Sequence, residues 1–225
     1  MRALRSSRAA KFAAVAAVAL GLAAGATGTA NAAGHTSPWL TGAQMPQASA
    51  FHWQTQGRPD GGFVGNGDFQ WLFTCGPTGP LHALHVSAFA QQAFATKVHR
   101  VEGGQTLLRF SSAAKAKAAL KVIESDYANC AQRIDRGPVD YDLHKHVHAS
   151  VDRTAWIQQG IAYRLEIRNA AGRPGNIPDL PTDAQEFFVQ RGNTISFVQI
   201  EGTNAHLDAT AGSLNVLKTM AARLG

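Results

Sequence analysis

Apolar residues recur at alternating steps of four and three in the middle of the chain, which is the period of one helix face. Ser111 or Ser112 supplies a hydroxyl suited to the N-cap, and Gly137-Pro138 stops the pattern. We expect an amphipathic helix with this buried stripe: Ala116, Leu120, Ile123, Tyr127, Cys130 and Ile134.

A second apolar stripe of helical period closes the chain. Asn204 is its expected N-cap, and Lys218 and Arg223 sit favourably near the negative end of the helix dipole. The predicted apolar side consists of Leu207, Ala211, Leu214, Leu217, Ala221 and Leu224.

Alternation with period two predicts strands elsewhere. Residues 139–151 carry apolar side chains at odd positions, apart from Lys145, and polar ones at even positions; a strand pair follows over 154–168. Hairpins are predicted over 81–110, turning at Glu102–Gln105, and over 187–200. The even, polar positions of the first strand are Asp140, Asp142, His144, His146 and His148.

Turn-forming residues separate these elements. The runs 57–68 and 173–181 are rich in Gly, Pro, Asn and Asp and predict loops. Short returns between strands favour antiparallel pairing, because parallel crossovers need a dozen residues or more. The order predicts an α+β fold of one domain, a curved antiparallel sheet with two main amphipathic helices packed mostly on one side.

The N-terminus has the pattern of a secretory signal peptide over residues 1–32. A basic head precedes an apolar stretch from Phe12 to Ala24 and a small-residue exit at Ala30-Asn31-Ala32. We therefore expect a secreted, extracellular protein with an extended arm over 33–68, a domain over 69–225 and no later transmembrane segment. The cations of the head are Arg2, Arg5, Arg8 and Lys11.

Charge argues against nucleic acid as a partner. Removal of the four cations of the basic head from a chain of net charge +6 leaves +2. Lys115, Lys117 and Lys121 precede Glu124 and indicate a solvated helix face rather than a basic stripe. We expect a monomer.

Cys75 and Cys130 are the only cysteines. An isolated pair in an oxidising compartment usually forms a disulfide. Cys-x-x-Cys spacing, which a redox pair would need, and further ligands at short spacing, which a zinc site would need, are both missing. A structural disulfide is therefore predicted.

The run Phe110–Ala116 leads into a helix that reaches Cys130, strands follow, and Val189–Val198 precedes a closing helix. In this order the chain, over residues 40–225, resembles the extracellular sensor domains of actinobacterial receptor kinases of the PknH type and their stand-alone secreted relatives. The resemblance implies a cleft over the sheet that binds an extracellular ligand. It supplies no catalytic residues. The chain lacks a kinase segment and one of the two disulfides of that pattern.

His144, His146 and His148 are expected on one face of a strand, with Asp142 beside them. Imidazoles bind Zn or Cu, which makes an extracellular metal site one hypothesis. A polar strand face in solvent is the alternative, because a flat strand splays its side chains. A pH-sensitive ligand wall is a third possibility.

Catalytic signatures are weak. The sequence has neither a Gly-x-Ser-x-Gly elbow nor a His-Glu-x-x-His motif. A secreted hydrolase could still use a carboxylate pair from Asp140, Asp142 and Glu166.

The favoured expectation is a non-catalytic, sensor-like domain that binds a small molecule or a cell-envelope component, without a required cofactor. The predicted ligand-binding residues are Asp142, His144, His146, Trp156, Tyr163 and Arg164.

Overall fold

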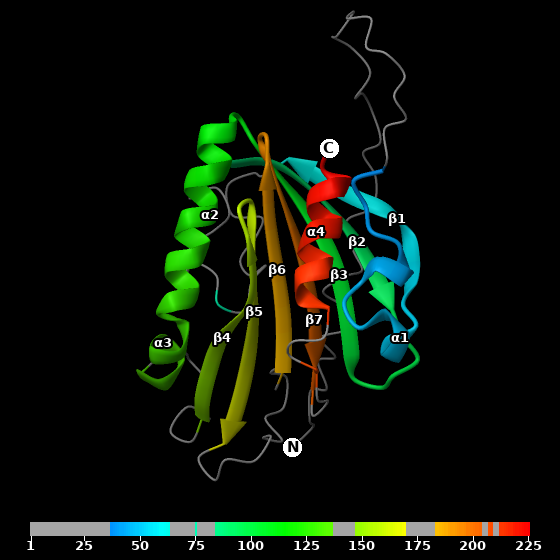
Figure 1. The fold of residues 1–225 in the computed structure, drawn as a ribbon, viewed down its shortest axis with the longest axis vertical. Coiled ribbons are helices and arrows are strands. Elements are labelled where there is room, and N and C mark those ends of the chain that lie inside the picture. The colour runs from blue at the N-terminus through cyan, green and yellow to red at the C-terminus, as the bar shows by residue number, and fades with distance from the viewer. Residues whose placement is uncertain are drawn as a thin grey trace, which may run out of the picture. The chain divides into compact units, whose positions relative to one another are not determined.

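The alternating segments pair into one antiparallel sheet in the computed structural model of the chain (Figure 1). The structure describes residues 37–63, 75, 84–136, 147–169, 183–203, 207–208 and 212–225. Within them the sheet has seven strands in the order β1-β2-β3-β7-β6-β5-β4. The strands are β1 (Gln54–Phe63), β2 (Val86–Ala95), β3 (Val101–Phe110), β4 (Val147–Ile157), β5 (Gly160–Asn169), β6 (Asp183–Arg191) and β7 (Thr194–Gly202). The helices are the 3-10 helix η2 (Gly42–Gln44), α1 (Ala48–Phe51), α2 (Ala113–Ala128), α3 (Cys130–Arg136) and α4 (Ser213–Arg223). The predicted α+β class is confirmed.

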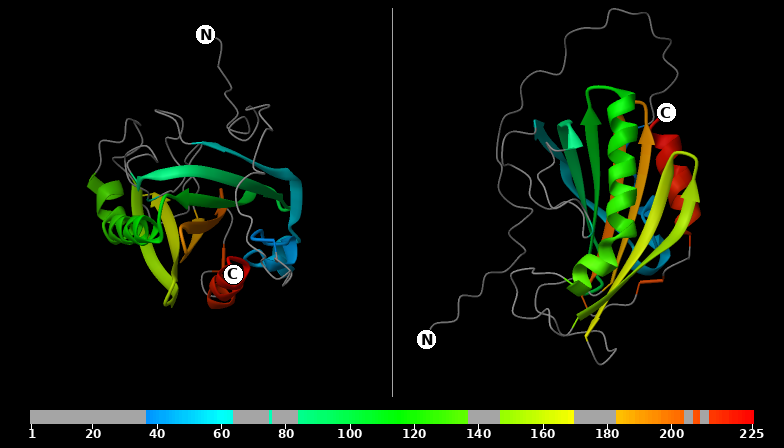
Figure 2. Two further views of the ribbon diagram at one scale, coloured as in Figure 1. Left: turned by 90° about the horizontal axis from the view of Figure 1, so that it is seen from above. Right: turned by 90° about the vertical axis from the view of Figure 1, so that its left-hand side faces the viewer.

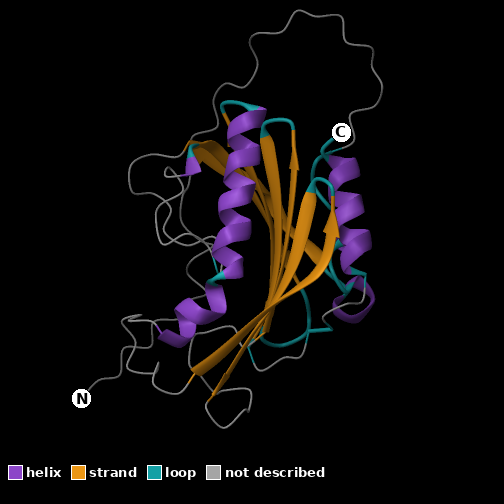
Figure 3. Ribbon diagram, turned by 60° about the vertical axis from the view of Figure 1, so that its left-hand side comes forward, coloured by secondary structure: helices purple, strands orange, loops and turns teal. Residues whose placement is uncertain are grey.

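Each face of the sheet carries its own apolar core. Phe188 of β6 packs in a cluster with Ile123 of α2, while its neighbour Phe187 packs in a cluster with Leu217 and Met220 of α4. Figure 2 shows α2 and α4 on opposite sides of β4 and β5, and Figure 3 shows the sheet between the two long helices. We call the two sides the α2 face and the α4 face. The expectation of helices mostly on one side is wrong, because β6 is buried on both faces.

Helix α2 begins where the sequence predicts. The Ser112 hydroxyl accepts a hydrogen bond from the Lys115 N–H at 3.2 Å. The predicted stripe is confirmed, since Ala116, Leu120, Ile123, Tyr127 and Cys130 are buried and Ile134 packs against them. The single predicted helix is interrupted at Asn129, whose side-chain amide donates to the Ser125 carbonyl at 2.9 Å.

Strands β2 and β3 form the predicted hairpin, but the chain reverses at residues 96–100 rather than at Glu102–Gln105. Gly103 lies inside β3, beneath the Trp53 ring. A Cβ at Gly103 would stand 3.0 Å from two carbons of that ring, so the ring would have to shift by a few tenths of an ångström to admit it. The glycine therefore serves close packing in a strand and not a turn.

The turn-rich run 57–68 is a strand as far as Phe63, so the loop prediction is wrong there. Gly57 has a φ of +64°, and the pairing with β2 shifts register between Gln56 and Asp60. Pro59 falls inside this irregular stretch of an edge strand, where a missing N–H is tolerated. A bulge thus accommodates residues that normally break strands. Residues 64–68 lie outside the described part.

The remaining strand predictions mostly hold. The pair over 154–168 is confirmed as the end of β4 and most of β5, and the hairpin over 187–200 is confirmed as β6 and β7. Gly192 has a φ of +56° in the second turn, a conformation that suits glycine. Ala149 and Val151, at odd positions of the first strand, pack against the α2-face core. Residues 139–146 are not described.

Helix α4 is shorter than predicted. It begins at Ser213 after Gly212, whose φ is +81°, and the expected cap Asn204 lies outside the described residues. Leu207 is buried but precedes the helix, and Leu214 is 44% exposed.

Residues 36–225 form one compact unit. The expected signal peptide and the proline-rich run 173–181 lie outside the described residues. No helix in the described ranges is long and apolar enough to cross a membrane.

Candidate functional site

Strand β4 contains one extra residue near its C-terminal end. Arg153 pairs with Tyr163 and Ala155 with Ala162, so Thr154 is unmatched and forms a β-bulge. A hollow of about 370 Å³ lies over the bulge. We call it the β4 hollow; its lining residues are Arg153, Thr154, Ala155 and Trp156. Bulges commonly re-aim side chains at sheet edges, and here the bulge gathers three different chemical groups at one spot.

Trp156 is the most exposed of the large apolar side chains in the described ranges. Its side chain is 64% exposed, whereas the others lie between 39% and 44%. Those others, Val98, Val122 and Leu214, stand on different elements. An indole so exposed gains little from the fold and is available for contact with another molecule.

Thr154 contributes a hydroxyl without a protein partner. Its Oγ1 atom is buried and neither donates nor accepts a hydrogen bond within the described residues. A buried hydroxyl in this state destabilises the fold by about 1–3 kcal/mol. The β4 hollow is therefore lined by a residue whose hydroxyl is buried and unsatisfied, beside an exposed aromatic ring.

Replacing Thr154 with valine removes this hydroxyl and keeps the branched shape. We expect Thr154→Val to raise the free energy of unfolding by about 1 kcal/mol, because no hydrogen bond is lost. Urea unfolding followed by circular dichroism measures the change. The matched control is Thr55→Val at an exposed position of edge strand β1, expected to stay within about 0.5 kcal/mol of the unmodified protein. A Thr154→Val protein less stable than the parent would show that the hydroxyl is satisfied.

Tyr163, a predicted ligand-binding residue, lies largely inside the α2-face core. Its side chain is 7% exposed and its ring stacks on Tyr127, with the ring centroids 4.4 Å apart. Burial raises the pKa of Tyr163 to about 12, helped by the charge of Glu124 and opposed by that of Arg153. Glu124 of α2 and Arg153 of β4 thus both lie near this hydroxyl.

The pKa of Tyr163 predicts a loss of stability in alkali. Below pH 10 the hydroxyl is neutral in both states; above it the unfolded chain ionises first, because its pKa is the ordinary 10.0 and the folded value is about 12. We expect the free energy of unfolding to fall by about 2–3 kcal/mol between pH 10 and pH 12 from this group. Denaturant titrations of the parent and of Tyr163→Phe measure the difference. Parallel pH profiles for the two proteins would contradict the assignment.

Arg164 lies on the opposite face from Tyr163, as neighbours on a strand do. Its guanidinium binds both carboxylate oxygens of Asp183, at 3.1 and 2.9 Å, and also pairs with Glu166. The hydrogen bond to Asp183 raises the pKa of Arg164 still further above its ordinary value. Asp183 also accepts the N–H of Leu207 at 2.9 Å. The predicted ligand contact Arg164 is thus engaged in holding the segment before α4 on the sheet.

A buried carboxylate that the sequence analysis missed lies under α2. Glu186 of β6 is 1% exposed; it accepts the Tyr127 hydroxyl on one oxygen and the Gln199 amide at 3.0 Å on the other. Gln199 also donates to Glu201. The available signal was a glutamate inside a strand that is otherwise buried on both faces. These bonds stabilise a charge in the core and couple α2 to β6.

The histidine cluster lies mostly outside the described residues, since Asp142, His144 and His146 are not described. His148 is 70% exposed at the side chain, with Nδ1 4.0 Å from an oxygen of Asp135. Within the described ranges no group of three His, Cys, Asp or Glu residues could hold a metal ion. The three-histidine Zn or Cu site remains a prediction.

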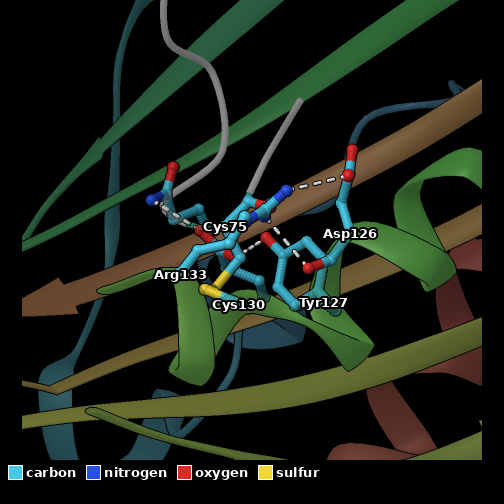
Figure 4. Close-up of a disulfide and its surroundings, with 7 residues drawn as sticks. Cys75, Asp126, Tyr127, Cys130 and Arg133 are labelled. Carbon is cyan, nitrogen blue, oxygen red and sulfur yellow. Dashed lines mark hydrogen bonds and ion pairs between the residues drawn. A yellow bond between two sulfur atoms is a disulfide. The ribbon is translucent and has the colours of Figure 1, made fainter. Parts of the chain in front are cut away.

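The predicted disulfide is present. Cys75 and Cys130 are joined, with their Cα atoms 5.4 Å apart, and both residues are 1% exposed (Figure 4). Arg133 of α3 donates to the Cys75 carbonyl at 2.9 Å and to the Asp126 carboxylate at 2.9 Å. The bond and the arginine together tie Cys75 to the α2–α3 junction. The disulfide fits an oxidising, extracellular location.

The structure brings together only part of the predicted ligand site. Trp156 pairs with Ile161 on the α2 face, next to the pair formed by Arg153 and Tyr163, whereas Arg164 points to the α4 face. Glu166, the described member of the proposed hydrolase carboxylates, is paired with Arg164 and Arg168. Asp140 and its partner Asp142 are outside the described residues. Among the described residues that were predicted to bind a ligand, Trp156 in the β4 hollow is therefore the one whose side chain is accessible to a ligand.

Comparisons with known proteins give a likeness in structure but none in sequence family. No family model matches the sequence, and no curated protein does. A solved structure similar to this chain is the crystal structure of the extracellular domain of PknH from Mycobacterium tuberculosis. The two share 14% sequence identity with a TM-score of 0.48, over 82% of this chain and 92% of that one. Similarity at this level does not assign the chain to a family.

Proposed function

We propose that the protein is an extracellular, non-catalytic binding domain, sensor-like in role, and that it takes up a small molecule or a cell-envelope component at the β4 hollow. The observation that carries the proposal is Trp156, 64% exposed beside the unpartnered hydroxyl of Thr154. Binding sites combine an apolar surface with a few polar groups that orient the ligand. The hollow holds both kinds of group within four consecutive residues.

Three carboxylates of the described residues have partners within the fold, which supports binding over hydrolysis at these groups. Glu166 and Asp183 are both bound by the guanidinium of Arg164, and Glu186 accepts hydrogen bonds from Tyr127 and Gln199. A general acid needs a carboxyl group that is free to give up a proton to substrate. Carboxylates engaged in this way contribute to the fold instead. The disulfide adds a covalent attachment between Cys75 and the start of α3, which suits a domain outside the cell.

A thermal-shift screen tests the proposal. The full chain is screened against envelope fragments, oligosaccharides, lipids and metal ions, and a ligand is accepted when the melting temperature rises with its concentration. Trp156→Ala should abolish the shift, while Val122→Ala, an exposed apolar residue on α2, should leave it unchanged. A ligand that stabilises the parent and the Trp156→Ala protein equally would show that the binding site is not the β4 hollow. Turnover of a candidate ligand by the parent would contradict a non-catalytic role.

A further inference from the structure

We infer that the ligand of the β4 hollow is an acidic sugar, a pyranose ring carrying a carboxylate, which stacks on Trp156 and pairs with Arg153. The inference rests on the proposed function and names the chemical class of its ligand. Its three parts come from separate observations: an isolated exposed indole, unused hydrogen-bonding capacity around it, and a guanidinium without an ion pair.

The surroundings of Trp156 favour a sugar over an apolar ligand or a protein partner. The other exposed large apolar residues of the described ranges lie on other elements, so no continuous apolar patch surrounds the indole. Protein interfaces bury about 800 Å² on each partner and have an apolar centre. A pyranose needs only one aromatic face, because its C–H groups carry partial positive charge and the ring face is negative.

Groups able to form hydrogen bonds lie close to Trp156 along the chain. The buried Oγ1 of Thr154 has no partner, and Gln158 and Gln159, both exposed, form the turn that follows Trp156 in the chain. Hydroxyl groups of a sugar both donate and accept, which matches a threonine hydroxyl and amide side chains. The volume of about 370 Å³ is at the lower end of ligand pockets and suits one or two sugar rings.

Arg153 supplies the preference for an acid. It is exposed and, within the described residues, forms no ion pair, as is also true of Arg58; what sets Arg153 apart is its place in the lining of the β4 hollow. Its pairing with Tyr163 across the strands places it on the α2 face together with Trp156. The guanidinium plane binds a carboxylate through two parallel hydrogen bonds, which lysine cannot reproduce. The charges that act on the neighbouring Tyr163 are those of Glu124 of α2 and of Arg153 itself, so the acidic preference requires Arg153 to outweigh Glu124.

Isothermal titration of the full chain with trigalacturonate and with neutral maltotriose tests the inference. We expect trigalacturonate to bind at least tenfold more tightly than maltotriose at low salt. Trp156→Ala should weaken both sugars at least tenfold, and Trp156→Phe should restore part of the affinity. Arg153→Gln should weaken trigalacturonate about tenfold and leave maltotriose unchanged. Arg58→Gln, an exposed arginine on β1, is the matched charge control. Thr154→Val should bind more weakly although its fold is intact.

The outcomes separate this inference from the proposed function. Equal affinity for the two sugars, or an unchanged affinity in Arg153→Gln, overturns the acidic preference. If the folded chain binds neither sugar, the inference that the ligand is a sugar is overturned. If a ligand of another class then stabilises the parent but not Trp156→Ala, the proposed function stands without this inference. Self-association that Trp156→Ala abolishes, in place of sugar binding, would identify a protein interface and overturn the inference as well.

Discussion

Removal of the disulfide by a Cys75→Ala/Cys130→Ala double substitution should lower the free energy of unfolding by about 4 kcal/mol. The bond joins residues 55 positions apart, and the loop it closes limits the entropy of the unfolded chain. Small domains are stable by about 5–15 kcal/mol in total, so the loss is a large share of what holds this fold together. Urea unfolding of the parent, with and without reductant, and of the double variant measures it.

The contacts around the disulfide determine how the result is interpreted. Arg133 still donates to the Cys75 carbonyl after the sulfurs are removed, and it still pairs with Asp126. If the effect is due to chain entropy, the double variant should therefore keep native-like circular dichroism spectra at urea concentrations below its unfolding transition. It should also be accompanied by a larger m-value, because the unfolded chain expands. A loss below about 1 kcal/mol would contradict a stabilising role for the bond, and Arg133→Gln in the double variant then tests whether the arginine replaces it.

The parts of the fold that could be predicted depend on short stretches of chain. The α2 stripe, the Cys75–Cys130 bond and the hairpin around Gly192 follow from spacing, from cysteine count and from turn chemistry. Each of these signals is complete within a few residues or depends on composition alone. For that reason the sequence predictions and the structure differ mainly where segments distant in the sequence meet.

Gly103 and Gly57 show why the other parts could not be predicted. Two adjacent glycines favour a tight turn, but Gly103 lies inside β3, where Trp53, fifty residues earlier, packs closely on the backbone. Gly57 belongs to a strand because β2 provides pairing partners on both sides of a bulge. Backbone pairing with a distant strand overrides a local turn preference in both cases.

One feature of the candidate site can be predicted from the local sequence, and another depends on strand pairing. Alternation alone places Tyr163 and Arg164 on opposite faces, so they could not have lined one cleft. The position of Trp156 depends on the extra residue at Thr154, and nothing in the local sequence marks that bulge. The β4 hollow could therefore be recognised only once the register of β4 against β5 was known.

Tyr127→Phe should cost about 2–3 kcal/mol in the free energy of unfolding, because it removes a donor from the buried carboxylate of Glu186. The ring contacts remain: phenylalanine can still stack at 4.4 Å on Tyr163 and meet the edge of Phe188 at 5.4 Å. The change thus isolates the hydroxyl. Tyr163→Phe is the matched control, and at pH 7 it should cost less than about 1 kcal/mol.

A double-mutant cycle with Glu186→Gln shows whether the loss comes from the charge. The glutamine keeps the shape of the side chain and carries no charge to stabilise, so the penalty of Tyr127→Phe should shrink by at least about 1 kcal/mol in that background. Additive effects would mean that Tyr127 and Glu186 stabilise the fold independently. Coupling would mean that α2 is held to β6 through a charge-assisted hydrogen bond. Helix α2, which shares a core cluster with Tyr163 of β5 and Val151 of β4, would then be positioned by a polar contact in an otherwise apolar core.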